Sequence, residues 1–259
     1  MRPVYSRHLR RLQERRLLPE PVEAVYVAGS RVRGWGNVNS DLDFYVITAD
    51  RWDGGGARLA PVALQPDTVV IDRVRVDREQ WDVHYWMDSQ VEQVLAKVSW
   101  TEYDTNMSAG AMLTPVEADF LERLDYAVAV AGEAWLVRRR QEMQRSALRS
   151  ILVSRSIHRS HLFIEDAVGQ LRSHDEQSAV LSARLAFGCA VQALLAEHGK
   201  LVQSPKWTAR QFRETAQDVV SFDEYWALET MRSYDPADPG RWVEDVLAVC
   251  RRIAQAVRA

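Results

Sequence analysis

The chain has 259 residues, of which 47% are hydrophobic and 27% are charged, and its formal net charge is −3. This composition is typical of a globular protein with one large or two smaller domains, and it excludes collagen-like, disordered and small disulfide-rich chains. The two cysteines, Cys189 and Cys250, lie far apart in apolar stretches, and no apolar run reaches the roughly 18 residues of a membrane span. We therefore expect a cytoplasmic protein without a membrane partner.

Up to about residue 115, short β-rich runs alternate with turn signals. Compact apolar runs predict strands at residues 25–28 and 42–48, and alternating apolar and polar residues predict a half-buried strand at 68–76. A further strand is predicted at 81–86, after a polar turn at 77–80. Three consecutive glycines at 54–56 predict a hairpin tip.

The remainder of the chain has helical patterns. The segment Thr114-Pro115-Val116-Glu117 is a capping box with proline at the first helical position, and similar start signals occur at Ser221 and Asp238. Residues 181–198 are apolar with a helical period and stop at Gly199. The sequence therefore predicts an N-terminal domain of strands and helices, residues 1–114, followed by a helical domain, residues 115–259.

One segment, residues 29–43, has the form GS-x3-G-x5-SD-x-D and lies between two predicted strands. Gly29 permits close approach of the backbone to an anion, Ser30 adds a hydroxyl donor, and the residues after it can open a helix whose free N–H groups attract phosphate. Asp41 and Asp43 are two residues apart, so their carboxylates project from one face of a strand. Two neighbouring acids beside a phosphate site repel each other unless a divalent cation such as Mg²⁺ lies between them.

A third acid would complete a site for two metal ions. Asp82 lies on the predicted strand 81–86, whose flanking apolar residues would anchor it, and Asp72 on the preceding strand is the competing candidate. We prefer Asp82 for this role.

These residues resemble the signature of the polymerase-beta-like nucleotidyltransferase superfamily over about the first 110 residues. The two-domain layout looks most like the small-molecule branch typified by aminoglycoside adenylyltransferases, in which the acceptor binds between a catalytic domain and a helical bundle. The resemblance implies an α+β fold: a nucleotidyltransferase domain with a mixed β-sheet flanked by helices, and a C-terminal α-helical bundle.

The resemblance also implies roles for individual residues. Gly29, Ser30 and Ser40 would hold the nucleoside triphosphate, and Asp41, Asp43 and Asp82 would be catalytic and would ligate two Mg²⁺ ions. Lys206, one of three lysines in a chain that otherwise uses arginine, resembles a helical-domain lysine that reaches the triphosphate.

The implied reaction is transfer of a nucleoside monophosphate, in the first place AMP from ATP, to a hydroxyl of a small molecule such as an antibiotic or a secondary metabolite. Pyrophosphate is released. Asp82 is a possible base, but no glutamate stands at the expected point of its strand, and Glu79 and His84 are nearby, so the identity of the base is open.

Other functions remain as alternatives. Neither half of the chain has the excess of basic residues that a nucleic-acid substrate favours, so we expect no nucleic-acid partner. Transfer of AMP to a protein side chain, as in antitoxin-like members, is a second possibility, and a non-catalytic nucleotide-binding regulatory module is a third. The sequence does not indicate the acceptor, the preferred nucleotide or the oligomeric state.

Overall fold

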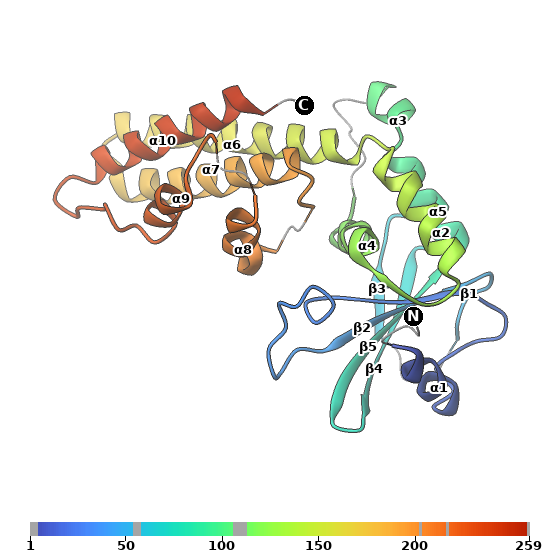
Figure 1. Cartoon of the computed structure of the whole chain (residues 1–259). Coiled ribbons are helices and arrows are strands. Elements are labelled where there is room, and N and C mark those ends of the chain that lie inside the picture. The colour runs from blue at the N-terminus through green and yellow to red at the C-terminus, as the bar shows by residue number, and fades with distance from the viewer. Residues whose placement is uncertain (1–4, 54–57, 106–112, 202–203, 216–217, 258–259) are drawn as a thin grey trace. The chain divides into compact units, whose positions relative to one another are not determined.

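The computed structural model describes residues 5–53, 58–105, 113–201, 204–215 and 218–257 (Figure 1). The chain divides into two compact units, residues 1–147, here the sheet unit, and residues 148–259, here the helical unit. The glycines at 54–56, where a hairpin tip is predicted, lie outside the described residues.

A six-stranded mixed sheet forms the centre of the sheet unit, as the α+β prediction requires. Its strands lie in the order β3-β4-β5-β2-β1-β6. β2 and β5 pair in parallel, and the other neighbours pair antiparallel. The strands are β1 (Val22–Ala28), β2 (Leu42–Thr48), β3 (Arg58–Pro61), β4 (Thr68–Val76), β5 (Glu79–Met87) and β6 (Val128–Ala131).

Helices cover both faces of this sheet (Figure 1). One face packs with α1 (Ser6–Glu14) around a core that includes Leu12, Phe44 and Trp81. On the other face, Trp86 of β5 packs against Phe120 of α4 (Pro115–Tyr126), with ring centroids 4.3 Å apart. The same face carries α5 (Glu133–Gln144). α5 is joined to α2 (Asp88–Lys97) by ion pairs, and the short helix α3 (Trp100–Thr105) follows α2.

The division between the units lies later than the boundary at 114/115 that the sequence predicts. Thr114 caps α4 as expected, accepting a hydrogen bond from the Glu117 N–H, but this helix packs on the sheet. The strand β6 then pairs with β1, so residues 115–147 belong to the sheet unit. The change from strand-rich to helix-rich sequence therefore does not mark the boundary between the units.

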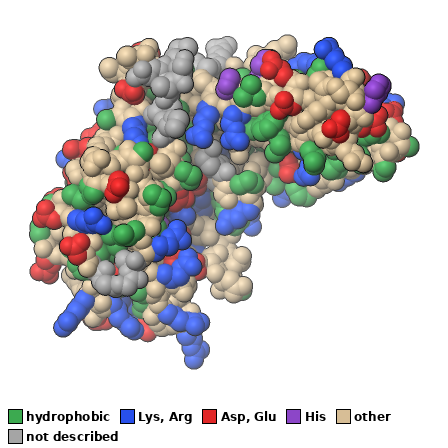
Figure 2. All heavy atoms as spheres, turned by 180° about the vertical axis from the view of Figure 1, so that it is seen from behind, with side chains coloured by type: hydrophobic (Ala, Val, Ile, Leu, Met, Phe, Trp, Pro, Cys, Tyr) green, Lys and Arg blue, Asp and Glu red, His purple; other side chains and the backbone are tan. Residues whose placement is uncertain are grey.

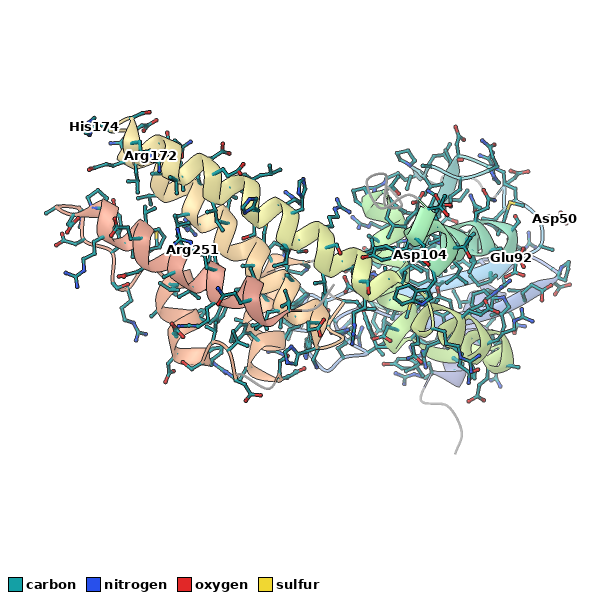
Figure 3. All side chains as sticks on the ribbon, turned by 90° about the horizontal axis from the view of Figure 1, so that it is seen from above. Asp50, Glu92, Asp104, Arg172, His174 and Arg251 are labelled. Carbon is teal, nitrogen blue, oxygen red and sulfur yellow. The ribbon has the colours of Figure 1, made fainter. Side chains whose placement is uncertain are left out.

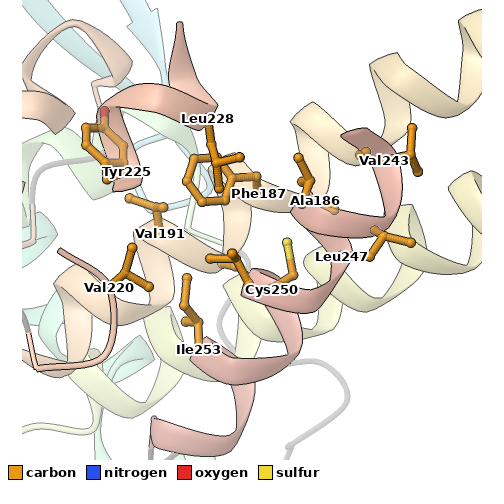
Figure 4. Packing of buried hydrophobic residues seen from close by; sticks show 14 of the residues in the cluster. Ala186, Phe187, Val191, Val220, Tyr225, Leu228, Val243, Leu247, Cys250 and Ile253 are labelled. Atoms are coloured by element: carbon orange, nitrogen blue, oxygen red, sulfur yellow. The ribbon is translucent and has the colours of Figure 1, made fainter. Parts of the chain in front are cut away.

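The helical unit consists of long α-helices and shorter ones packed against them. Its elements are α6 (Leu148–Arg172), α7 (Glu176–Glu197), the 3₁₀ turn η1 (Pro205–Trp207), α8 (Thr208–Arg213), α9 (Phe222–Glu229) and α10 (Pro239–Ala256). Side chains from α7, α9 and α10 form one apolar core, in which Phe187, Leu228 and Cys250 lie close together (Figure 4). Cys189 and Cys250 are both buried free thiols.

Within the described part of the chain, α7 is the one helix long and apolar enough to cross a membrane. About two thirds of its apolar window (67%) is buried inside the protein, as expected for a core helix. The composition of α7 is therefore weak evidence for a membrane span.

Candidate active site

Three aspartates lie at one end of the parallel strand pair β2–β5. Asp43 of β2 and Asp82 of β5 are direct partners in the parallel register, so their side chains leave the sheet on the same face. Asp41 lies two residues before Asp43, immediately before β2 begins. Asp72, the competing candidate for the third acid, pairs with Val83 and therefore lies on the opposite face, the face covered by α1.

Two arginines hold two of these aspartates. Arg73 of β4, opposite Asp82 in the antiparallel register, binds its carboxylate through two hydrogen bonds of 2.8 and 2.7 Å. Arg123 of α4 places Nη1 2.8 Å from Asp43 Oδ2 and Nε 2.8 Å from Asp119 Oδ2. The Arg73 side chain is 67% exposed and the Arg123 side chain 20% exposed. Arg73 is therefore the cation that leaves its partner at lower cost.

A row of aromatic side chains lies on the same face of the sheet as the aspartates, two residues further along β2 and β5. Tyr26, Tyr45 and His84 stack across β1, β2 and β5, with centroid distances of 4.9 and 4.6 Å and nearly parallel rings. The Tyr45 hydroxyl donates to Asp119 Oδ2 at 3.2 Å, which connects this row to Arg123. These contacts fix the backbone that presents Asp43 and Asp82.

The pKa values of two groups in this region follow from their surroundings. Burial raises the pKa of Asp43, against the opposing effect of Arg123, and the neighbouring Asp119 and Asp82 raise it further. Burial, with the charge of Arg123, lowers the pKa of His84 to about 4. His84 is thus neutral near pH 7, and its ring is stacked on Tyr45. Glu79 is bound to Arg31 and Trp81 on the α1 face, away from Asp82.

The turn after β1 brings Gly29 directly against Asp43. Gly29 has φ +89°, and a Cβ atom placed there would lie 1.9 Å from Asp43 Oδ2. The group that approaches Gly29 closely in this structure is the Asp43 carboxylate, and the approach of a phosphate to Gly29 stays a prediction. Gly34, also in the turn, has φ +70° with open space around it.

Residues 30–34 form a turn instead of the helix start that the sequence predicts. The N–H groups of Trp35 and Gly36 both donate to the Ser30 carbonyl, at 2.8 and 2.9 Å, and this closes the turn. The Ser30 hydroxyl and the N–H groups of residues 30–32 form no hydrogen bond with another described residue. Successive free N–H groups of this kind attract anions even without a helix.

The other predicted nucleotide ligands have different surroundings. Ser40 Oγ accepts a 2.8 Å hydrogen bond from the Asn37 N–H, so it stabilises the loop and keeps its own hydrogen to donate. Lys206 belongs to η1 in the helical unit, and its ammonium lies 5.4 Å from the centre of the Trp207 ring. Its contact with a nucleotide stays a prediction.

The three aspartates fit a divalent cation in donor chemistry, and they lie at the same end of one strand pair. They supply the hard oxygen donors that Mg²⁺ prefers. The negative charges of all three also interact with the Arg73 guanidinium. Its bonds to Asp82, with the charges of Asp41 and Asp43, raise the pKa of Arg73. Among the described residues, no three acidic, histidine or cysteine side chains converge closely enough to hold a metal ion. A bound metal ion would therefore take the place of Arg73 and need further ligands.

The fold is an α+β arrangement with a mixed sheet and a helical unit, and it is nucleotidyltransferase-like. The chain is similar to the solved structure of a nucleotidyltransferase-like protein from Exiguobacterium sibiricum 255-15, with a TM-score of 0.54 and 12% identity. The match covers 97% of this chain and 74% of that chain. No family model and no curated protein matches the sequence. At 12% identity the similarity concerns the fold alone and does not distinguish a small-molecule branch.

Sequence reasoning missed Arg73 and Arg123. The signal for Arg73 is its place on the predicted strand 68–76, opposite Asp82 across the turn that follows. For Arg123 the signal is weaker, since only its spacing of four residues from Asp119 on a capped helix is visible in the sequence.

Proposed function

We propose that the chain is a Mg²⁺-dependent nucleotidyltransferase that moves a nucleoside monophosphate, in the first place AMP from ATP, to a hydroxyl of a small molecule. The observation that carries this proposal is the pairing of Asp43 and Asp82 on adjacent parallel strands, with Asp41 beside them and a turn with free N–H groups next to them. The nucleotidyltransferase-like fold supports the same class of reaction.

In the proposed reaction, the acceptor oxygen forms a bond to the α-phosphorus while the bond to the bridging oxygen breaks, and pyrophosphate leaves. Mg²⁺, when bound by Asp41, Asp43 and Asp82, supplies charge neutralisation at the phosphate oxygens. Asp82 accepts the proton of the acceptor hydroxyl, since Glu79 lies on the other face and the His84 ring is stacked on Tyr45. The Ser30 hydroxyl and the turn N–H groups orient the triphosphate.

The proposal that the acceptor is a small molecule rests on charge and composition. On the face seen in Figure 2, acidic and basic side chains occur over both units. With a net charge of −3, this distribution favours a small acceptor over a polyanionic nucleic acid. An antibiotic and a secondary metabolite are both consistent with it.

The direct test is titration of each nucleoside triphosphate with Mg²⁺, by calorimetry, into the wild type and Asp41→Asn. Asp41 forms no ion pair with another described residue, so this variant removes a proposed ligand and leaves both arginine pairs intact. We expect the variant to lose metal-dependent nucleotide binding and to release pyrophosphate about 100-fold or more slowly.

Asp50→Asn is the matched control, because Asp50 is an exposed acid just past the opposite end of β2 (Figure 3). Equal metal-dependent binding by all three proteins would contradict the metal site. Metal-dependent binding of a nucleotide by the wild type without pyrophosphate release in the presence of hydroxylated acceptors would favour the non-catalytic module.

Arg73→Ala tests whether Arg73 competes with the metal ion. We expect Mg²⁺ alone to bind the variant roughly 3- to 10-fold more tightly, because the guanidinium no longer occupies Asp82. Stability in metal-free buffer should fall by only about 1 kcal/mol, since the Arg73 side chain is largely exposed. Tryptophan fluorescence measures the affinity in a titration with Mg²⁺, and urea denaturation of the metal-free protein measures the stability. Arg75→Ala, on the same strand and face, should leave the Mg²⁺ affinity unchanged.

Lys206→Ala tests the proposed contact between Lys206 and the triphosphate. Loss of one exposed cation should weaken ATP binding by about 10-fold and leave the thermal midpoint unchanged, because Lys206 is exposed on a short 3₁₀ turn. Calorimetric titration with Mg²⁺ and ATP makes the measurement. An unchanged affinity would remove Lys206 from the proposed site.

A further inference from the structure

Helix α1 concentrates positive charge on one side. Residues 7–16 contain five arginines and one glutamate, a net charge of +4 in a chain whose total is −3. The apolar side of the helix is buried on the sheet, where Leu12 is fully buried and the His8 ring packs against Phe44 and Trp81. The other side, here called the basic face, carries the exposed residues Arg7, Arg10 and Arg15 and the half-buried Arg11.

Most of the charge on the basic face is not neutralised. Arg11 forms an ion pair with Asp77, in the turn between β4 and β5. Arg7, Arg10 and Arg15 form no ion pair with another described residue, and neither does Glu14, the one acid of the helix. The basic face therefore presents three cations to solvent beside one that already holds a carboxylate.

Two of these cations lie where they destabilise the helix. Arg7 is in the first turn, at the positive end of the helix dipole, and no acidic residue stands in that turn to balance it. Arg7 also repels Arg10 and Arg11, which lie three and four residues further along the same side. Arg15, in contrast, complements the dipole at the helix C-terminus. Helix stability thus explains Arg15 but not Arg7 and Arg10, and a departure from local rules of this kind is expected at functional surfaces.

The contact between Arg11 and Asp77 indicates which anion suits the basic face. A guanidinium binds a carboxylate through two parallel N–H groups, and the Asp77 carboxylate occupies one of the arginines in this way of pairing charges. A lipid bilayer fits less well, because the apolar side of α1 is buried on the sheet and is not available for insertion.

A nucleic acid also fits less well. The nine residues of α1 span only about 13 Å, which limits the number of phosphates in reach, and Glu14 interrupts the positive charge. Outside residues 7–16 the chain has a net charge of −7, so a long polyanion that extends beyond α1 is repelled.

We propose that the basic face is a docking surface for an acidic segment of another protein, whose carboxylates pair with Arg7 and Arg10. Such a partner supplies the negative charge that the first turn of α1 lacks. The basic face lies on the side of the sheet opposite Asp43 and Asp82, and the proposal does not depend on nucleotide transfer.

The test uses the full chain and a fluorescein-labelled peptide of ten glutamates, with binding followed by fluorescence anisotropy. We expect saturable binding at about 10 mM salt, where charges act over about 30 Å, and weaker binding at about 150 mM salt. The double variant Arg7→Gln, Arg10→Gln should bind about 10-fold or more weakly, because two unpaired cations are removed.

Arg155→Gln, Arg159→Gln is the matched control. These two arginines are exposed, lie four residues apart on α6 and form no ion pair with another described residue, so the control changes the net charge equally. It should bind the peptide as the wild type does. Equal weakening by both double variants would overturn the proposal, since binding would then follow net charge and not the basic face.

Thermal unfolding without the peptide separates loss of binding from loss of structure. Arg7→Gln, Arg10→Gln should unfold at the wild-type temperature or above it, because repulsion within α1 is relieved. A lower unfolding temperature would overturn the argument, since the two arginines would then stabilise the fold.

The competing partners are measured at the same salt concentration. Absence of saturable peptide binding would overturn the proposal. Tighter binding of a labelled twelve-residue oligouridylate, or of phosphatidylserine vesicles, than of the peptide would also overturn it, in favour of a nucleic acid or a membrane surface.

Discussion

Replacing Gly29 by alanine is expected to destabilise the protein by about 3 kcal/mol and to displace Asp43 from Arg123. Part of this loss is local, because φ +89° costs an alanine about 1–2 kcal/mol. The rest comes from the new Cβ atom, which would lie 1.9 Å from Asp43 Oδ2 and 3.3 Å from Arg123 Nη1. The carboxylate must move, and the ion pair is lost with it. Urea denaturation measures the change in the free energy of unfolding.

Gly34→Ala is the matched control for this substitution. Gly34 lies in the same turn with φ +70°, but nothing surrounds it within 4 Å, so it should lose only the backbone contribution of about 1 kcal/mol. In the Asp43→Ala background, Gly29→Ala should lower the free energy of unfolding no more than Gly34→Ala does, because the carboxylate that clashes with the new Cβ atom is absent. Equal costs of the two glycine variants in the wild-type background would contradict the close approach of Gly29 and Asp43.

The strands that carry the site could be predicted closely from the sequence. The bounds of β2 and β4 are those given by the apolar run at 42–48 and the alternation at 68–76. Asp77 and Arg78 both have positive φ, 47° and 75°, as a two-residue type I′ hairpin requires. The sequence predicts a longer turn, at 77–80, whereas β5 begins at Glu79, and the two-residue turn sets the register that pairs Arg73 with Asp82.

The position of Arg123 could not be predicted in this way. Arg123 reaches Asp43 because α4 lies across the sheet, with Phe120 packed on Trp86, and such a contact depends on side chains distant in sequence. The strand β6 was missed for a similar reason. It has four residues, lies between two helices and is defined by its pairing with β1. Because the packing of α4 on the sheet and the pairing of β6 with β1 were not predicted, residues 115–147 were assigned to the helical domain instead of the sheet unit.

The same limits apply to the turn after Gly29. The spacing of Gly29, Ser30 and Gly34 indicates a phosphate-binding segment in which the residues after Ser30 can open a helix. The structure closes the segment through the Ser30 carbonyl, which accepts from Trp35 and Gly36. Trp35 also packs with the Arg33 guanidinium, which lies 4.5 Å from its ring centre. These interactions within the loop compete with helix formation and are not visible in a motif.

Replacing Arg123 by alanine is expected to cost about 2–3 kcal/mol of stability at neutral pH. The substitution leaves Asp43, whose side chain is 17% exposed, beside Asp82 and Asp119 with no cation in contact. Loss of one partner of a fully buried pair costs more than this, and the partial exposure of Arg123 and Asp43 reduces the effect. Urea denaturation again gives the free energy of unfolding.

The pH dependence of this loss identifies Asp43 as its source. Burial already raises the folded-state pKa of Asp43 above its ordinary value, and removal of Arg123 raises that pKa further. Between the unfolded and folded pKa values the folded protein binds more protons, so stability falls as pH rises through that window. The window is wider in Arg123→Ala. The loss relative to wild type should therefore be smallest in acid, where Asp43 is protonated in both states, and should grow toward neutral pH.

Arg140→Ala separates this effect from the general loss of a large side chain. Arg140 donates to the carbonyl oxygens of Leu124 and Ala127, which do not titrate, so its loss should not depend on pH between about pH 4 and pH 7. In Asp43→Asn, removal of Arg123 should lose most of its pH dependence as well, because the group whose pKa changes is absent. If Arg123→Ala instead costs the same at every pH, Arg123 acts through packing and through Asp119, and Asp43 is not the carboxylate that it stabilises.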